Sequence, residues 1–183
     1  MRPSQIRRTA ETSLQLLEWR GHGTPDALLL AWVAWEGLKI RTVCVGLARM
    51  GFQVQHVYDV LSEEKVHALD DYRRLFKSVF GSFPESAKGV GKQWQELEDL
   101  RDTRHKIVHG MGSDKPDRLE RGTRLLAGAA MNPDWLAPLS VVRDDVRVPI
   151  GSPFAAMRSP GRRPKYELRE MVVASRPTRR QSW

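Results

Sequence analysis

Arg104 and His109 stand five residues apart in the chain, and Gly110 follows immediately. The arginine guanidinium is a permanent cation whose planar fork binds phosphate, and histidine can exchange a proton near neutral pH. A proton carrier and a clamp on phosphoryl charge supply most of what metal-free cleavage of an RNA phosphodiester needs. RNA is the expected substrate because its 2′-hydroxyl is the available nucleophile when no metal activates water.

These residues resemble the R-polar-x-x-x-H motif of the HEPN superfamily, which consists of small all-helical domains, many of them ribonuclease toxins or antiviral effectors. His105 occupies the polar position, Leu100-Arg101-Asp102-Thr103 precedes the arginine, and Ile107-Val108 leads into the histidine. The resemblance covers about residues 4–138, and only the motif within it is specific.

The resemblance implies a metal-independent endoribonuclease of toxin or antiphage-defence type, with RNA as substrate and no cofactor or metal. In this interpretation Arg104 binds the scissile phosphate, and His109 is the general base or acid. Arg101 is a secondary phosphate contact, and His105 has a supporting role. An antitoxin or a defence-system protein is a further partner that the resemblance suggests.

The same resemblance implies a homodimer. Arg104 and His109 lie about 140° apart around an ideal helix, so one helix cannot present both on a narrow stripe. In the family, motifs from two protomers face each other across a cleft, and a composite Arg/His site is expected here. Met111 stands where some of these toxins carry a tyrosine that a nucleotidyltransferase modifies, which excludes that modification at this position.

A non-catalytic interpretation of the basic stretch stays open. Cations near a helix C-terminus are favoured by the helix dipole, and His109 with Gly110 fits an ordinary C-cap. The chain would then be a non-catalytic helical module that binds nucleic acid or protein. A metal-dependent hydrolase is disfavoured, because His56 and His67 lack the spacing of a paired-ligand motif.

Composition limits the class of protein. Residues 139–183 hold 10 Lys and Arg against 4 Asp and Glu, whereas the first 138 residues hold 20 against 18. The basic extension suggests a polyanionic partner. Cys44 is the only cysteine, which excludes an intramolecular disulfide, and its apolar neighbours predict a buried, inert thiol. No apolar run is long enough for a membrane span, and a cytoplasmic location is expected.

Hydrophobic periodicity predicts an all-α fold, and the resemblance implies a HEPN-like helical bundle over residues 1–138. The expected helices are 4–20, 25–50, 52–61, 63–80, 94–109 and 115–131, with Ser62 as an N-cap and 81–91 as a loop. A basic, partly irregular extension follows at 139–183. It has a small β-hairpin expected at 141–148, a short helix or strand at 166–173, and a tail at 176–183 that is disordered unless bound.

The second helix is apolar nearly all round, which indicates a central or interfacial position. Glu36 interrupts it, and a buried carboxylate needs a partner. Arg104 or Arg101 is one candidate partner, which makes Glu36 a supporting site residue. Solvent exposure or a local pair with Lys39 is the other.

Overall fold

The computed structural model describes residues 1–66, 69–112, 114–143, 146–149, 153–154, 157 and 161–175 of the chain. Their structure is mainly helical, so the expected all-α class is confirmed. The helices are α1 (Pro3–Arg20), α2 (Pro25–Arg49), α3 (Val54–Glu63), α4 (Leu69–Phe80), α5 (Gly91–Glu98), α6 (Arg101–Val108), α7 (Pro116–Met131) and α8 (Lys165–Ala174). Short 3-10 turns occupy Pro84–Ser86 and Pro133–Leu136.

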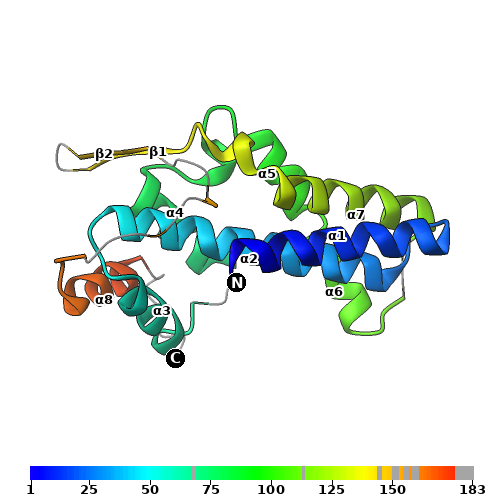
Figure 1. Cartoon of the computed structure of the whole chain (residues 1–183), viewed down its shortest axis with the longest axis horizontal. Helices are drawn as coiled ribbons and strands as arrows, with labels where there is room; N and C mark the ends of the chain where they lie inside the picture. The colour runs from blue at the N-terminus through cyan, green and yellow to red at the C-terminus, as the bar shows by residue number, and fades with distance from the viewer. Residues whose placement is uncertain are drawn as a thin grey trace, which may run out of the picture.

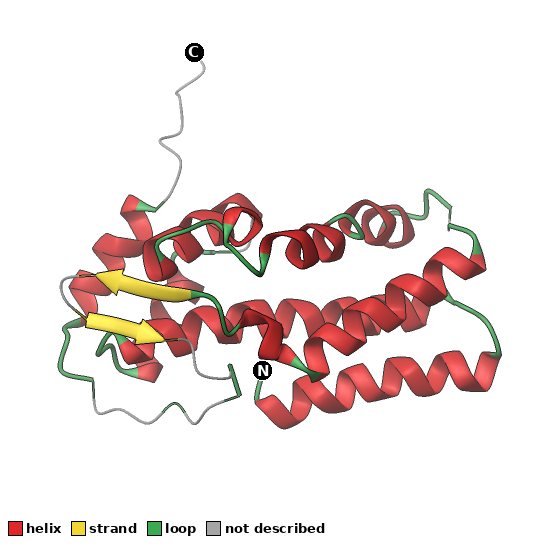
Figure 2. Cartoon of the chain, turned by 90° about the horizontal axis from the view of Figure 1, so that it is seen from above, coloured by secondary structure: helices red, strands yellow, loops and turns green. Residues whose placement is uncertain are grey.

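Three long helices form the body of the molecule (Figure 1). A turn at Gly21, whose φ is 71°, reverses the chain between α1 and α2, and α7 packs against both. α5 contacts α7 and α6 contacts α2, while α3 and α8 pair at the far end. The view in Figure 2 separates the long helices and shows the strands at the same end as α8.

α2 is the central helix of the bundle. Its buried side chains face several directions and include Leu28, Trp35, Leu38 and Leu47, each fully inaccessible. A helix that is apolar all round must be covered on most sides, and α1, α3, α4, α6 and α7 all contact α2. Gly46 allows a close crossing by α4, since a Cβ there would come within 2.4 Å of Val79 Cγ1.

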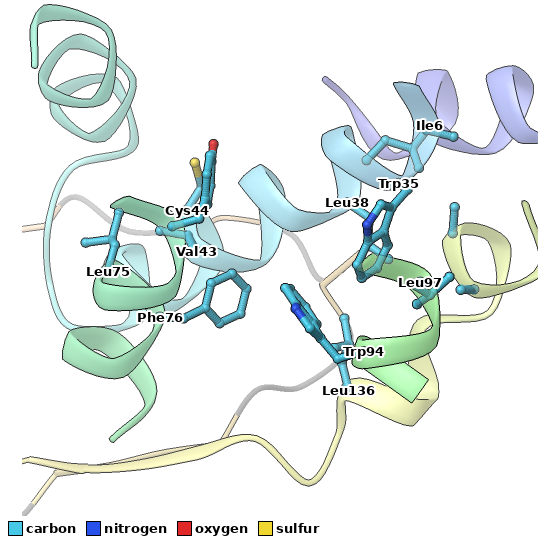
Figure 3. Packing of buried hydrophobic residues seen from close by; sticks show 14 of the residues in the cluster. Ile6, Trp35, Leu38, Val43, Cys44, Leu75, Phe76, Trp94, Leu97 and Leu136 are labelled. Atoms are coloured by element: carbon cyan, nitrogen blue, oxygen red, sulfur yellow. The ribbon is translucent and has the colours of Figure 1, made fainter. Parts of the chain in front are cut away.

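An aromatic cluster joins α2, α4 and α5 (Figure 3). The Trp94 ring meets the Trp35 ring edge-on, with centroids 4.9 Å apart, and meets the Phe76 ring at 5.0 Å in the same manner. Such edge-to-face pairs contribute about 0.5–1.5 kcal/mol each beyond the burial of their surface. The cluster fixes α5, the helix that leads to the motif, against the centre of the bundle.

Part of the basic extension packs back onto the bundle. Leu168 and Val172 of α8 belong to the hydrophobic core. Lys165 and Arg169 both bond to the Glu63 carboxylate at the end of α3. These two cations of the extension are therefore engaged within the chain rather than free for a polyanion.

Two backbone features complete the extension. Strands β1 (Ser140–Arg143) and β2 (Val146–Pro149) pair antiparallel, and the expected turn at 144–145 lies outside the described residues. The Arg163 N–H donates to the Gly51 carbonyl at 3.1 Å. Gly161 is required beside it, because a Cβ there would stand 2.3 Å from the same oxygen. The expected tail at 176–183 also lies outside the described residues.

Two expected helix boundaries are wrong. Ser62 lies inside α3 rather than at an N-cap, since α3 continues to Glu63. The single helix expected at 94–109 is two helices, because Leu100 N–H bonds to the Leu97 carbonyl with 3-10 spacing. This tighter turn at Asp99 and Leu100 changes the direction of the chain between α5 and α6. The motif therefore occupies a short helix of its own.

Candidate active site

The motif residues lie at the C-terminal part of α6 and at its cap. Arg104 is half-buried within the helix, whereas His109 is the exposed C-cap residue. Gly110 follows with φ of 65° and donates to the Ile107 carbonyl, and Met111 N–H donates to the Lys106 carbonyl at 2.9 Å. This pair of bonds is a Schellman cap, which glycine favours because it adopts positive φ without strain. The cap holds the backbone of His109 in one place.

The guanidinium of Arg104 is not engaged by the rest of the molecule. Among the described residues, its side chain makes no hydrogen bond, ion pair or ring contact. Arg101, one turn earlier, is exposed and equally unengaged within the same part of the chain. The two guanidiniums lie about 60° apart around the helix, so one anion can contact both.

His105 and His109 form a pair on one face of α6. They are four residues apart, and their ring centroids lie 4.3 Å apart with 51° between the ring planes. Both side chains are exposed. Arg104 and His109, in contrast, remain about 140° apart around the helix. One protomer therefore presents the motif arginine and the motif histidine in different directions.

Glu36 does not pair with the motif arginines. Its carboxylate bonds to Lys39 Nζ at 3.1 Å, three residues along α2, so the local pair is the correct alternative. Lys39 also bonds to Glu98 of α5 at 2.9 Å, and both of those side chains are 3% exposed. Trp35 Nε1 donates to the same Glu98 oxygen at 3.0 Å. A buried Lys39–Glu98 pair thus fixes the end of α5, three residues before the motif helix begins.

A groove beside the motif helix was not foreseen from the sequence. It encloses about 380 Å³ between α7 and the segment formed by the end of α5 and the Asp99–Leu100 turn, which precedes α6. Leu100 and Leu125 contribute apolar surface to it. Arg118 and Arg121 contribute cations, and Glu96 and Asp99 contribute carboxylates. Gly122 keeps the two walls close, since a Cβ there would lie 3.0 Å from Leu100 Cδ2. The arginines were missed because they belong to α7, distant in sequence from the motif.

The two groove arginines differ in their partners. Arg118 lies 3.4 Å from Asp114, whose other contact is a 2.6 Å hydrogen bond donated by Thr103 of α6. Arg121 is exposed and has no ion pair or hydrogen bond within the described parts of the chain. Arg124, one turn later, is paired instead with Glu120 at 2.8 Å. Arg121 is the groove cation free to accept an external anion.

Cys44 is buried, as expected. Its side chain is fully inaccessible, and burial raises the pKa of its thiol to about 12. No group of three or more metal-ligating side chains occurs among the described residues. None of the helices in the described ranges is both long and apolar enough to cross a bilayer.

Comparison with known proteins identifies no relative. No family model matches the chain, and no curated protein and no solved structure is significantly similar to it. The functional argument therefore rests on the residues and geometry of α6 and its surroundings.

Proposed function

We propose that this chain is a metal-independent endoribonuclease of HEPN type, with a HEPN-like bundle and a role as a toxin or antiphage-defence effector. Arg104 and His109 are its catalytic residues, and Arg101 and His105 support them. Glu36 is withdrawn from the site because Lys39 neutralises it locally. An antitoxin or another protein of a defence system is the expected regulatory partner.

One observation carries the proposal: Arg104 is a half-buried residue whose guanidinium lacks an internal partner among the described residues. A structural arginine is normally compensated by an acceptor, and Arg104 has none within the described residues. An external phosphate would supply that acceptor through the bidentate geometry that guanidinium favours. The exposed imidazole of His109, fixed by the Schellman cap, lies on the same short helix.

The site is completed by a second copy of the chain. Because Arg104 and His109 point about 140° apart on one helix, a shared phosphate needs groups from two protomers. Exposed apolar side chains lie on α2 and α6 and in the loop that follows: Val33 is 48% exposed, Val108 49% and Met111 61%. Their burial between two copies would offset part of the cost of association. Light scattering at micromolar concentration should return twice the monomer mass.

The chemistry follows from the nucleophile within RNA. The 2′-oxygen attacks the adjacent phosphorus, the bond to the 5′-oxygen breaks, and the products are a 2′,3′-cyclic phosphate and a 5′-hydroxyl. One His109 removes the proton of the 2′-hydroxyl, and the partner's His109 protonates the leaving 5′-oxygen. Arg104 stabilises the charge that grows on the non-bridging oxygens, and Arg101 contacts a neighbouring phosphate.

The test is cleavage of a structured RNA in the presence of EDTA. His109→Ala and Arg104→Ala should each lower the rate by about 10²–10³, and the double variant should fall little further because the two residues act as a unit. Lys106→Ala is the matched control, since it removes an exposed cation from the same helix outside the motif. Cleavage products of the wild type should carry 2′,3′-cyclic phosphate ends.

Two outcomes would overturn the proposal. Equal rates for the wild type and both motif variants would place the activity elsewhere or in a contaminant. RNA binding without cleavage by the wild type would instead support the non-catalytic binding module.

A further inference from the structure

We propose that His105 and His109 form a two-imidazole chelate for a divalent transition-metal ion, Cu²⁺ foremost, and that the bound ion inhibits the chain. The inhibitory step rests on the proposed ribonuclease function, whereas metal binding by the pair does not. The site is regulatory, since the proposed reaction itself uses no metal.

The geometry of the two rings carries the inference. A metal–nitrogen bond of about 2.0–2.1 Å places an ion about 3.2 Å from the centre of each ligating ring. The two ring centres lie 4.3 Å apart. An ion about 3.2 Å from each centre would therefore have an angle of about 85° between its directions to the two rings. That angle suits adjacent positions of a tetragonal complex, whereas tetrahedral coordination needs a wider one.

The preference for the metal follows from this angle and from the donors. Tetragonal sites built from nitrogen and oxygen are typical of Cu²⁺ and Ni²⁺, and Cu²⁺ binds most strongly along the first-row divalent series. The pair lacks a third metal-ligating side chain among the described residues, so water fills the remaining positions. Zn²⁺ prefers tetrahedral coordination, so this histidine pair should bind it with lower affinity than Cu²⁺.

The backbone preorganises the pair. His109 N–H donates to the His105 carbonyl at 3.1 Å, so the two residues stand one regular helical turn apart. The cap at Gly110 then stops the helix end from fraying, and a Cβ on this glycine would meet nothing within 4 Å. The ring of each histidine has no hydrogen bond within the described residues, which leaves the nitrogens available to an ion.

Neighbouring charges set an upper limit on the affinity. Arg101 stands one turn before His105, and its cation repels a metal ion. Asp102, three residues before His105, is exposed and without an ion pair in the described parts of the chain, and its carboxylate acts in the opposite direction. Because repulsion by Arg101 and attraction by Asp102 act in opposite directions, we expect the ion to bind reversibly rather than as a permanent structural metal.

Inhibition follows from occupation of the imidazole nitrogen. A histidine that ligates a metal through its lone pair can no longer remove a proton with that nitrogen. In the proposed mechanism His109 moves the proton, so a bound ion stops the reaction while the fold stays intact. Removal of the ion by EDTA restores the free imidazole.

The first arm of the experiment measures binding alone. Full-length protein is stripped with EDTA, dialysed and titrated with CuSO₄, with electron paramagnetic resonance as the readout. One ion per chain with two equatorial nitrogens is expected. His105→Ala should weaken binding by at least about tenfold, because the chelate becomes a single imidazole. His22→Ala is the control, since His22 is an exposed histidine outside the pair. Equal affinity of wild type and His105→Ala would overturn the metal site.

The second arm measures RNA cleavage by the wild type and His22→Ala. Their rates should fall in parallel with Cu²⁺ occupancy and return with EDTA, and RNA with Cu²⁺ alone serves as the blank. Undiminished cleavage at full occupancy would overturn the inhibitory role. Two-nitrogen Cu²⁺ binding by a protein that never cleaves RNA would support the metal site and refute the ribonuclease, which separates the two failures.

Discussion

The buried Lys39–Glu98 pair predicts that its two members are not equivalent. Lys39 bonds to two carboxylates, Glu98 at 2.9 Å and Glu36 at 3.1 Å. The Glu98 carboxylate has one cation, together with the indole N–H of Trp35 on the same oxygen. Its other oxygen is buried and has no hydrogen-bond partner among the described residues. Loss of Lys39 therefore strands a buried charge, whereas loss of the charge on Glu98 leaves Lys39 paired with Glu36.

The magnitudes follow from this difference. Lys39→Met should lower the free energy of unfolding by about 3–5 kcal/mol, the usual cost of leaving one buried charge without its partner. Glu98→Gln should cost only about 1–3 kcal/mol, because the amide still accepts a hydrogen bond from Trp35. The double variant should be more stable than the sum of the two changes predicts, since removal of both charges leaves no uncompensated charge at the buried site.

Urea unfolding followed by tryptophan fluorescence and by circular dichroism measures all three changes. Glu36→Gln serves as the control: its carboxylate is 39% exposed, so its effect should stay within about 1 kcal/mol. A smaller loss for Lys39→Met than for Glu98→Gln would refute the reasoning. Strict additivity in the double variant would show that the pair is not coupled.

Three further predictions concern other parts of the molecule. Because burial holds the Cys44 thiol protonated to about pH 12, the unfolded chain loses this proton first as pH rises. The free energy of unfolding should therefore fall above about pH 9, by about 1.4 kcal/mol per unit for this group, and Cys44→Ala should flatten that slope in urea titrations at several pH values. Arg121→Ala should weaken RNA binding and lower the salt slope by about 0.7, while Arg124→Ala should leave both unchanged in fluorescence titrations. Leu168→Ala should destabilise the chain by about 2–5 kcal/mol in thermal or urea unfolding, and an unchanged midpoint would mean that α8 does not contribute to the core.

Local patterns identified much of the helical structure. The limits of α1 and α2 follow from Gly21, Pro25 and the apolar spacing, because these signals act within a few residues. The break between α5 and α6 has no such signal. It arises where Leu97 and Leu100 are both buried and the backbone tightens between them, which depends on the packing of other helices.

The contacts that the sequence does not predict join residues that are distant in the chain. The contact of Lys39 with Glu98 spans 59 residues, and a sequence shows only that each charge needs some partner. For that reason the sequence leaves both the motif arginines and Lys39 as possible partners of Glu36, and the fold selects Lys39, three residues away. The motif itself could be identified because Arg104 and His109 are close in the chain, whereas Arg121 comes beside Leu100, which precedes the motif helix, only through the fold.

The motif helix is weakly anchored, and this has a consequence for its dynamics. Of the eight residues of α6, Thr103 alone is buried. An element with so little buried surface opens with a smaller free energy than global unfolding, as a separate cooperative unit of the native protein. Amide protons of α6 should then exchange with solvent faster than those of α2. A partner protein that binds only the state in which α6 is folded against the bundle would thus restrain the site without contacting either Arg104 or His109.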